Sequence, residues 1–368
     1  MDRTVADLAT AINIMWMLIA GFLVFFMQAG FALVETGFTR AKNVAHTMMM
    51  NIMVFAIGAL GYWLVGFAFQ FGGVNFSFPA VGNNLAWAFS PTTLGDWGTA
   101  LQTWLIKIGE HGILGGSGFM LAGVASSGLL AFFLFQMVFM DTAATIPTGA
   151  MAERFKFVGF CLMGLWVSMF IYPLLGNWVW GGGWLANLGR TAGLGNGVVD
   201  FAGSGVVHMI GGSVALAGAL VIGPRIGRFN RDGSANAMPG HNIPMGILGT
   251  IILFFGWFGF NPGSSLAFTG GGQGLAVNAA VNTLLAGAAG GVSAMLYMWL
   301  FGPTRKPDPG LSVNGLLAGL VAITAPCAFV SSWAAVVIGL VAGMVVCLVT
   351  FAIEKLHIDD PVGAVPVH

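Results

Sequence analysis

Long apolar runs separated by short polar segments dominate the pattern of this chain. A helix needs about 20 apolar residues to cross the hydrocarbon core of a bilayer, so runs of this length predict membrane spans. We expect spans near residues 12–35, 44–70, 120–147, 156–176, 201–223, 241–262, 275–301, 310–329 and 333–354. These spans are about nine in number, and Pro361 begins a tenth. The pattern therefore predicts an all-α polytopic membrane protein.

Composition agrees with lipid contact over most of the surface. Hydrophobic residues make up 57% of the chain and charged residues 7%, whereas a soluble domain typically carries about 25% charged residues. So few charges cannot cover a globule of this size in water. Many of the 57 glycines lie inside apolar runs, where small residues let membrane helices approach closely. The net charge of zero suggests no nucleic-acid partner.

The basic residues divide unequally between the two ends of the expected spans. Ten lie on one side: Arg40, Lys42, Arg154, Lys156, Arg225, Arg228, Arg231, Arg305, Lys306 and Lys355. Three lie on the other side: Arg3, Lys107 and Arg190. By the positive-inside rule the larger group is cytoplasmic and the N-terminus is outside. We therefore expect a multi-pass protein of the cell (plasma or inner) membrane with its N-terminus outside.

The longest segment between two expected spans covers residues 72–118, on the outer side. It contains Trp87, Trp97 and Trp104. Tryptophan is enriched at membrane–water interfaces, so we expect interfacial aromatics or a short re-entrant element here.

Two short segments of the sequence repeat one spacing. Asp200 precedes His208 by eight residues, and Asp360 precedes His368 by eight residues. The first pair opens the fifth span and the second pair opens the tenth, and these two spans enter from opposite sides. This echo indicates an internal repeat in which two histidines occupy equivalent places.

A repeat of five spans has a topological consequence. Five is an odd number, so the second half would be inserted upside down relative to the first. Inverted repeats of this kind are common in transporters, where the working site lies near the midplane at the repeat interface. We expect a single transmembrane domain over residues 1–368, with inverted halves of about 1–225 and 238–368.

Ionisable residues inside membrane spans are rare, costly and usually functional. The candidates are His208 and His368, with Asp141 and Asp200 near span ends. Two histidines from inverted helices could meet inside the bundle and share one proton between facing ring nitrogens. The alternative is that each histidine only forms a hydrogen bond within the bundle. Asp200 precedes an apolar run, so capping of the following helix is a sufficient structural reason for it.

The sequence shows no metal site and no catalytic constellation. A metal ion wants three or four ligands, and no cysteine or carboxylate spacing near either histidine supplies them. The H-E-x-x-H and G-x-S-x-G motifs of hydrolases are absent. We therefore expect no metal, no other cofactor and no enzymatic activity. Glu35 and Glu153 lie near basic residues, so ion pairing is the simplest explanation for both.

Six blocks of the sequence resemble signatures of the ammonium transporter (Amt/MEP/Rh) family. They are residues 27–37 followed by Arg40, Lys42 and Asn43, then 149–154, 180–183, 200–203, 256–264, and 359–361 followed by Val367 and His368. The blocks extend over the whole chain in the family's order. Trp180 favours the Amt branch over the Rh-type branch, whose outer site is less aromatic.

The resemblance implies roles for four residues at the outer end of a pore. Phe139, Trp180 and Ser264 match the family's outer recruitment site for ammonium. Aromatic faces attract this cation by cation–π interaction, and a serine hydroxyl can accept one of its N–H bonds. Phe139 and Phe260 match a stacked pair of phenylalanines that gates the pore below that site.

The resemblance also implies roles deeper in the membrane. His208 and His368 match the twin histidines that line the pore, and Asp200 matches the family's essential aspartate. Ammonium would lose its proton near the gate, and ammonia would then pass the dry pore beside the histidines. The proton would travel separately along the histidine pair, which makes net transport electrogenic.

The resemblance further implies partners and a departure from the family. Relatives are homotrimers with one pore per subunit, and PII-type signalling proteins dock on many of them from the cytoplasm. Family members continue beyond the tenth span, in which this chain stops at His368, so we interpret the sequence as truncated there. Some members are ammonium sensors with a signalling domain fused after the last span. A sensor is therefore the alternative to a transporter.

Overall fold

The computed structural model describes residues 3–73, 103–109, 111–124 and 126–368. In this part of the chain eight helices are long and apolar enough to cross a membrane. They are Thr4–Phe38, Ala41–Phe71, Ser127–Met151, Phe157–Val179, Ser204–Ile222, Ile243–Gly263, Gly272–Phe301 and Ser332–Lys355. A ninth apolar helix, Pro309–Thr324, is shorter. The prediction of a polytopic helical membrane protein is confirmed.

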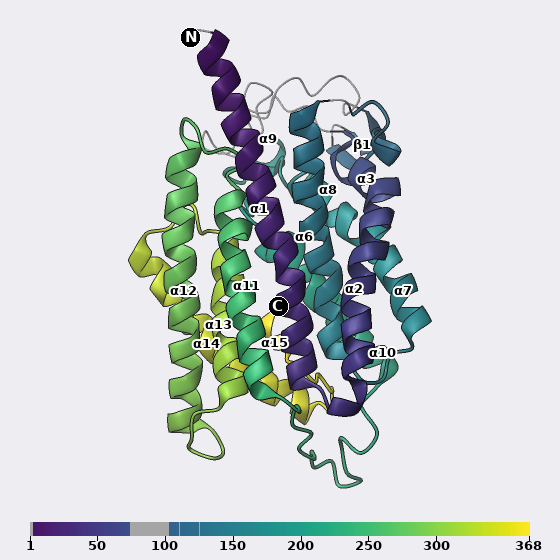
Figure 1. Cartoon of the computed structure of the whole chain (residues 1–368), viewed down its shortest axis with the longest axis vertical. Coiled ribbons are helices and arrows are strands. Elements are labelled where there is room, and N and C mark those ends of the chain that lie inside the picture. Colours follow the sequence, from purple (N-terminus) through teal and green to yellow (C-terminus); the bar gives the residue numbers. More distant parts are fainter. Residues whose placement is uncertain (1–2, 74–102, 110, 125) are drawn as a thin grey trace.

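Figure 1 shows these spans as coiled ribbons, and they are built from α-helices, π-helical segments and a 3-10 turn. The first part of the chain forms α1 (Arg3–Phe38), η1 (Ala41–Asn43), α2 (Val44–Gly61), η2 (Tyr62–Gly66), α3 (Phe67–Phe71), β1 (Trp104–Ile108), β2 (His111–Gly115), η3 (Phe119–Leu121), α6 (Ser127–Met151), α7 (Phe157–Trp166), η4 (Val167–Ile171), α8 (Tyr172–Val179), α9 (Leu188–Ala192), η5 (Ser204–Met209) and α10 (Ile210–Ile222). The second part forms α11 (Ile243–Gly263), α12 (Gly272–Phe301), α13 (Pro309–Thr324), α14 (Ser332–Lys355) and α15 (Ala364–Val367). The segments η2, η4 and η5 are π-helical.

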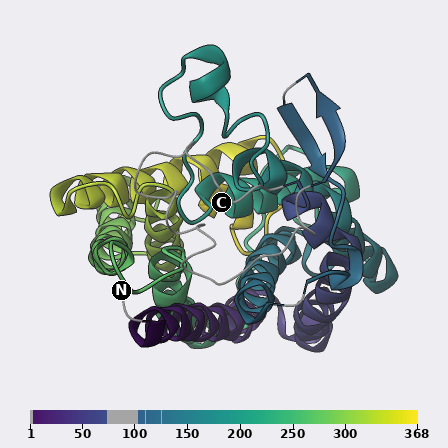
Figure 2. The same cartoon turned by 90° about the horizontal axis from the view of Figure 1, so that it is seen from above.

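The helices form one bundle, and the described chain ends at mid-height within it (Figure 1, Figure 2). Helix α1 packs along α11 and also contacts α6 and α2, whereas α12, α13 and α14 pack on one another. A Cβ atom added at Gly343 of α14 would lie 2.2 Å from the carbonyl oxygen of Gly290 of α12. No real Cβ atom tolerates that distance, so glycine is required where these two helices meet.

Three predicted span boundaries are wrong by five residues or more. The first span begins at Thr4 rather than near residue 12, since its helix extends beyond the continuous apolar run. The third span begins at Ser127 rather than near residue 120, because Met120 and Leu121 take positive φ angles of 53° and 59°. The hydroxyl of Ser126 then accepts a hydrogen bond from the backbone N–H of Leu129 at 3.1 Å and starts the helix. These backbone angles are incompatible with a continuous helix from residue 120.

The predicted span 310–329 also ends early, since α13 stops at Thr324. Pro326 has no backbone N–H to donate, and the N–H of Ala325 donates to Ser204 Oγ at 2.7 Å instead of to a carbonyl of the helix. The turn that follows is held by Asn282 of α12, whose Nδ2 donates to the carbonyl oxygens of Cys327 and Val330 at 2.8 Å each. A side chain distant in sequence therefore sets this boundary.

A β-hairpin lies at the end of the bundle near the N-terminus and was not predicted (Figure 1, Figure 2). Strands β1 and β2 pair antiparallel, with Trp104 opposite Gly115. The indole Nε1 of Trp178 in α8 donates to the carbonyl oxygen of Ile113 at 3.1 Å and joins the hairpin to the bundle. The other two tryptophans expected at an interface, Trp87 and Trp97, lie outside the described residues.

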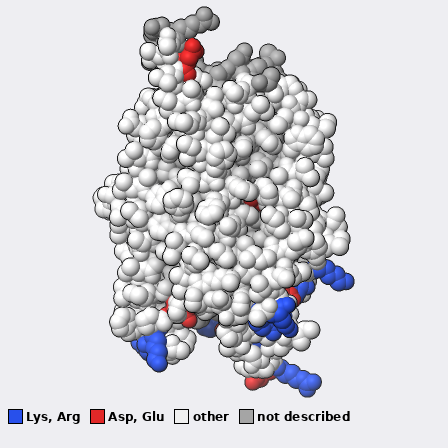
Figure 3. Space-filling view, viewed as in Figure 1, with Lys and Arg blue, Asp and Glu red and all other residues white. Residues whose placement is uncertain are grey.

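Charged residues gather at the two ends of the molecule. Figure 3 shows a broad central band with almost no charge, above a lower end where Lys and Arg cluster. Such a band is what a helical bundle in a bilayer requires, because ionised side chains are costly in hydrocarbon. The end with most basic residues lies opposite the N-terminus (Figure 1, Figure 3).

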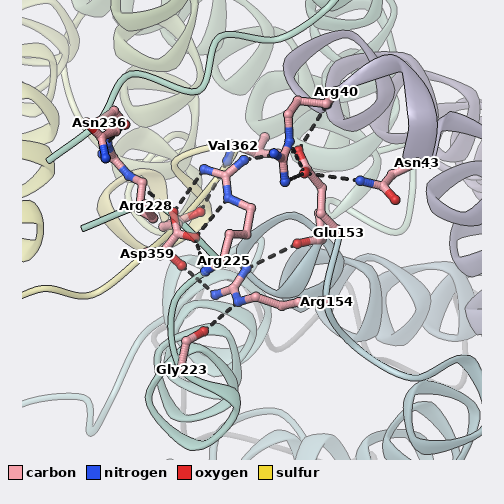
Figure 4. Close-up of polar contacts among 12 residues, drawn as sticks. Arg40, Asn43, Glu153, Arg154, Gly223, Arg225, Arg228, Asn236, Asp359 and Val362 are labelled. Carbon is pink, nitrogen blue, oxygen red and sulfur yellow. Dashed lines mark hydrogen bonds and ion pairs between the residues drawn. The ribbon is translucent and has the colours of Figure 1, made fainter. Parts of the chain in front are cut away.

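Arg225, just after α10, is the centre of an ion network at that basic end (Figure 4). Its side chain is buried, and it donates to the two carboxylate oxygens of Asp359 at 2.8 and 2.9 Å. Another of its nitrogens donates to Glu153 Oε1 at 3.0 Å. Arg40 binds the second oxygen of Glu153 at 2.5 Å. The ion pairing predicted for Glu153 is therefore confirmed.

The network favours the ionised forms of its two acids. Burial alone raises the pKa of Asp359, but hydrogen bonds from Arg225 and the nearby charges of Arg225 and Arg154 bring it below its ordinary value. Burial likewise raises the pKa of Glu153, and hydrogen bonds from Arg40 together with nearby arginine charges bring it below its ordinary value. The network ties the ends of α1, α6 and α10 to the segment that leads into α15.

Candidate functional site

Two histidines meet inside the bundle. His208 lies in the π-helical turn η5, and His368 follows α15. Their Nδ1 atoms are 3.1 Å apart, and their rings lie nearly parallel at a centroid distance of 5.1 Å. At this distance one Nδ1 carries the proton and the other accepts it. The two residues that share one spacing in the sequence are therefore hydrogen-bonded partners.

His208 is held in place by a turn built around Asp200. One carboxylate oxygen of Asp200 accepts the backbone N–H of Gly203 at 2.9 Å, and the other accepts those of Gly205 and Val206 at 2.9 and 2.8 Å. Gly203 has a φ of +116°, which L side chains rarely adopt. The carboxylate thus satisfies the free N–H groups that begin the helix, as predicted for Asp200.

The same turn recurs before His368. One oxygen of Asp360 accepts the backbone N–H of Gly363 at 2.9 Å, and the other accepts that of Val365 at 2.7 Å. Gly363 has a φ of +83° and precedes α15. The repeated spacing in the sequence therefore corresponds to a repeated local structure. In each copy an aspartate accepts backbone N–H groups, a glycine has a positive φ, and the helix that follows carries or precedes one histidine.

Aromatic rings lead to this histidine pair without a break. Phe139 of α6 stacks on Phe260 of α11 at a centroid distance of 4.0 Å and an interplanar angle of 27°. Trp180, directly after α8, makes a T-shaped ring contact with Phe139 at a centroid distance of 6.1 Å, and the ring centroid of Phe260 lies 5.5 Å from that of His208. The column therefore runs from Trp180 through the two phenylalanines to the histidines.

The interior of this column is closed to bulk solvent. Phe260 and His208 are 0% exposed and Phe139 is 1% exposed. Among the described residues, Nε2 of His208 has no hydrogen-bond partner. A buried polar atom without a partner is costly in a folded protein, and such atoms are enriched where function requires them. The column thus combines a dry wall with one polar atom left open.

Trp180 and Ser264 border the upper part of the column. The indole Nε1 of Trp180 donates to the carbonyl oxygen of Asp200 at 2.6 Å, so the Asp200 turn positions this ring as well as His208. Ser264 caps α11, and its hydroxyl donates to the carbonyl oxygen of Phe260 at 2.9 Å. Since the proton of this hydroxyl is engaged, its oxygen is available as an acceptor.

Trp257 belongs to this site, and sequence reasoning assigned it no role. Its ring stacks on His208 at a centroid distance of 5.2 Å and an angle of 13°. Its Nε1 donates to Thr324 Oγ1 at 3.0 Å, which fixes the plane of the ring. It lies in the block 256–264 that resembles a family signature, so position in that block was the available signal.

Glu35 is not placed as predicted. Its carboxylate oxygen Oε2 accepts a hydrogen bond from Nδ2 of Asn51 at 2.7 Å, inside the bundle. The amide of a neighbouring helix is therefore its partner, rather than the basic residues that lie close to it in sequence. Asp141 also differs from expectation, because it lies within α6 instead of near a span end and is only 2% exposed.

No group of three or more His, Cys, Asp or Glu residues that could hold a metal ion is found in the part of the chain that the structure describes. The site is thus made of rings, two imidazoles and backbone-bound carboxylates. Together the fold and this site define a polytopic membrane protein with a buried, ring-lined column through its bundle.

The chain belongs to the ammonium transporter family, whose model, Ammonium Transporter Family, matches residues 15–368. It is 45% identical to ammonium transporter Amt2 of Archaeoglobus fulgidus over 361 residues, which are 97% of this chain and 68% of that protein. It is 39% identical to ammonium transporter Amt1 of Haloferax mediterranei over 372 residues, which are 98% of this chain and 65% of that protein. These relatives are named as transporters, which are not enzymes.

Two solved structures share the fold. One is a Sensor Amt Protein, with a TM-score of 0.82 and 36% identity, over 98% of this chain and 80% of that one. The other is Mep2 of Candida albicans, with a TM-score of 0.74 and 26% identity, over 97% of this chain and 70% of that one. The likeness extends over nearly the whole chain, so the fold is that of the ammonium transporters.

Proposed function

We propose that this protein transports ammonium across a cell membrane through the ring-lined column. Family membership and the names of its relatives support ammonium or ammonia as the substrate. The observation that carries the proposal is the unbroken series of ring contacts from Trp180 to the paired histidines. It provides a dry route for a small neutral molecule and a separate polar pair for a proton.

The outer end of the column is the recruitment site in this proposal. Ammonium carries a full charge and four N–H bonds but no lone pair. The faces of Trp180 and Phe139 attract the charge, and a cation at an aromatic face gains about 0.5–2 kcal/mol. The oxygen of Ser264 accepts one N–H bond, because its own proton is already donated to Phe260.

The stacked rings of Phe139 and Phe260 form the gate below this site. Ammonium loses its proton near the gate, and neutral ammonia passes beside the histidines. A potassium ion would have to shed its hydration shell, and the described wall of the column offers it no ring of oxygens in exchange. Selectivity against potassium therefore follows from the cost of dehydrating an ion in an apolar passage.

The proton passes separately along the histidine pair. The Nδ1 atoms of His208 and His368 are close enough to exchange a shared proton. Transport of ammonia and of a proton in the same direction moves one net charge for each ammonium taken up. The proposed transport is therefore electrogenic.

The remaining expectations belong to the same proposal. The end of the bundle that holds the Arg225 network is cytoplasmic, which puts the N-terminus outside. Residues 1–225 and 238–368 form inverted halves, each contributing one histidine. Three copies assemble as a homotrimer with one pore per subunit, and a PII-type protein is a candidate partner at the cytoplasmic face.

The deciding experiment is an ammonium pulse on proteoliposomes that contain the full-length protein, with a potassium pulse as control. A saturable current with ammonium and none with potassium supports a selective electrogenic transporter. Uptake that shifts internal pH without current means electroneutral passage of ammonia. Equal currents with both ions contradict the proposed selectivity.

A second candidate function is ammonium sensing, because one structure with this fold is a Sensor Amt Protein. A sensor would bind ammonium at the same outer site and change state without sustained transport. Ammonium binding measured in detergent, together with neither current nor pH change in proteoliposomes, would favour sensing.

We expect Trp180→Leu to raise the half-saturating ammonium concentration about three- to tenfold, since it removes the aromatic face that attracts the cation. The measurement is the concentration dependence of the ammonium current. The matched control is Trp180→Phe, which loses the hydrogen bond to Asp200 but keeps an aromatic face. If both variants weaken affinity equally, the hydrogen bond rather than the ring face is responsible.

A further inference from the structure

Glu35 of α1 is a buried acid to which the proposed function gives no role. Only 3% of its surface is exposed. Its one described hydrogen-bond partner is neutral, the side-chain amide of Asn51 in α2. A carboxyl group inside a membrane bundle is costly, and such groups usually serve the passage of a substrate, ion or proton.

The Glu35 side chain borders a cavity that also reaches the histidine pair. This cavity has a volume of about 30 Å³, and its polar lining residues include Glu35, Asn314 and His368. A cavity needs roughly 10–15 Å³ to hold one water molecule, so there is room for a water or an ammonia molecule between these groups. Trp257, which stacks on His208, lines the cavity as well.

The cavity lies on the basic side of the histidine pair. Gly149 near the end of α6 and Val362 just after Asp360 both line it. His368 borders it, whereas the lining does not include His208. A molecule that has passed the histidines from the outer site therefore enters this cavity next, and Glu35 is the carboxyl group that it meets there.

A series of hydrogen bonds links Asn51, the partner of Glu35, to other helices of the bundle. Nε2 of Gln28 donates to the backbone carbonyl of Asn51 at 2.6 Å and to Thr145 Oγ1 at 3.1 Å. The hydroxyl of Thr145 lies 3.4 Å from a carboxylate oxygen of Asp141. The side-chain amide of Asn51 also donates to the carbonyl oxygen of Thr47 at 3.0 Å, which holds it in place to donate to Glu35 at the cavity. Asp141 stands at the far end of this chain and does not border the cavity in the described structure.

We propose that Glu35 is the proton-exchange group at the cytoplasmic mouth of the pore. A proton leaves His368, crosses a water molecule in the cavity and binds the Glu35 carboxylate. Ammonia in the cavity then takes this proton: the carboxyl O–H bond breaks, a fourth N–H bond forms, and ammonium leaves while Glu35 returns to the carboxylate. The proton removed at the outer gate is thereby returned, and no other reactant is needed. This inference rests on the proposed transport function.

A purely structural role for Glu35 makes a different prediction. In that case the carboxyl would serve only to join α1 to α2 through Asn51. Glutamine has nearly the same shape and can still bond to an amide, but it cannot take up and release a proton. Glu35→Gln therefore separates proton exchange from helix packing.

We expect Glu35→Gln to lower the maximal ammonium current about tenfold or more, in line with the size of positioned proton-transfer effects. The half-saturating ammonium concentration should stay unchanged, because the outer site is intact. Glu35→Asp keeps a carboxyl group and should retain part of the current. The matched control is Asp141→Asn, the same acid-to-amide change at the far end of the same chain, which should retain the wild-type current.

A second measurement on the wild-type protein does not depend on the variants folding. Infrared difference spectra of the wild type on addition of ammonium should show a carboxyl band that shifts when glutamate is labelled with ¹³C, and the absence of such a band would contradict proton exchange at Glu35. If the wild type gives an ammonium current and Glu35→Gln gives the same current, this inference is overturned but the proposed function stands. A wild type that transports no ammonium would overturn the proposed function and this inference together. An equal loss of current in Asp141→Asn would also contradict it, because the effect would then come from the buried chain and not from the cavity.

Discussion

We expect His208→Ala to reduce the ammonium current about tenfold or more, or to let potassium pass. The substitution removes the Nδ1 atom that lies 3.1 Å from His368, so the proton loses its separate path. It also removes the ring between Trp257 and His368, which opens space in the dry part of the column. A wider passage can admit water with an ion, which loosens selectivity.

The measurement for His208→Ala is the pair of currents after ammonium and potassium pulses on proteoliposomes. The control is His357→Ala, which removes an exposed imidazole that bonds the carbonyl oxygen of Gly233 and packs on Phe229, neither of which belongs to the column. Unchanged current and unchanged selectivity in His208→Ala would contradict the histidine path, whatever the control shows.

We expect Arg225→Ala to lower the free energy of unfolding by about 3–5 kcal/mol, because it leaves buried acids without their cation. Both carboxylate oxygens of Asp359 and one oxygen of Glu153 lose a hydrogen bond. Thermal unfolding of the purified protein in detergent measures the loss. Arg231→Ala, on the exposed part of the same loop, is the control and should change little. A small loss in Arg225→Ala would mean that the network contributes little to stability.

The same network predicts how stability depends on pH. The pKa values of Asp359 and Glu153 lie below their ordinary values, so both acids stabilise the folded state in ionised form. Their contribution is complete above the ordinary pKa of about 4 and is lost as the pH falls through the lowered values of the folded state. The melting temperature of the wild type should therefore fall in this acid range. The profile of Arg225→Ala should fall less steeply, since the shifts are smaller without Arg225.

The ion network and the histidine pair are connected by one short backbone segment, residues 359–368. Asp359, which binds Arg225, directly precedes Asp360, whose carboxylate holds the turn before α15. The position of His368 thus depends on contacts at the basic end of the bundle. We expect Arg225→Ala to impair transport as well as stability, although this residue does not line the column.

Much of the fold was readable from local pattern. The apolar runs predicted the spans because a bilayer imposes a minimum length and excludes charge along it. The boundary near residue 120 failed because positive φ angles at Met120 and Leu121 are not visible in hydrophobicity. The boundary at Thr324 failed because Asn282, on another helix, holds the turn after it. The hairpin of β1 and β2 was not predicted because its strands are short and do not strongly alternate between apolar and polar residues.

The sequence by itself determined the class of this protein and the positions of most of its apolar helices, and its resemblance to a known family pointed to the residues of the column, apart from Trp257. Its composition requires lipid, and the paired aspartate–histidine spacing marks two equivalent turns that each present a histidine. Only the tertiary structure decided which side chains meet. It brought Nδ1 of His208 to Nδ1 of His368 across 160 positions of sequence, stacked Trp257 on His208, and put Glu35 beside a cavity instead of beside a basic residue. The physical reason is that apolar pattern specifies that a helix is buried in a membrane, whereas the rotation of that helix against its neighbours depends on packing and hydrogen bonds between distant segments.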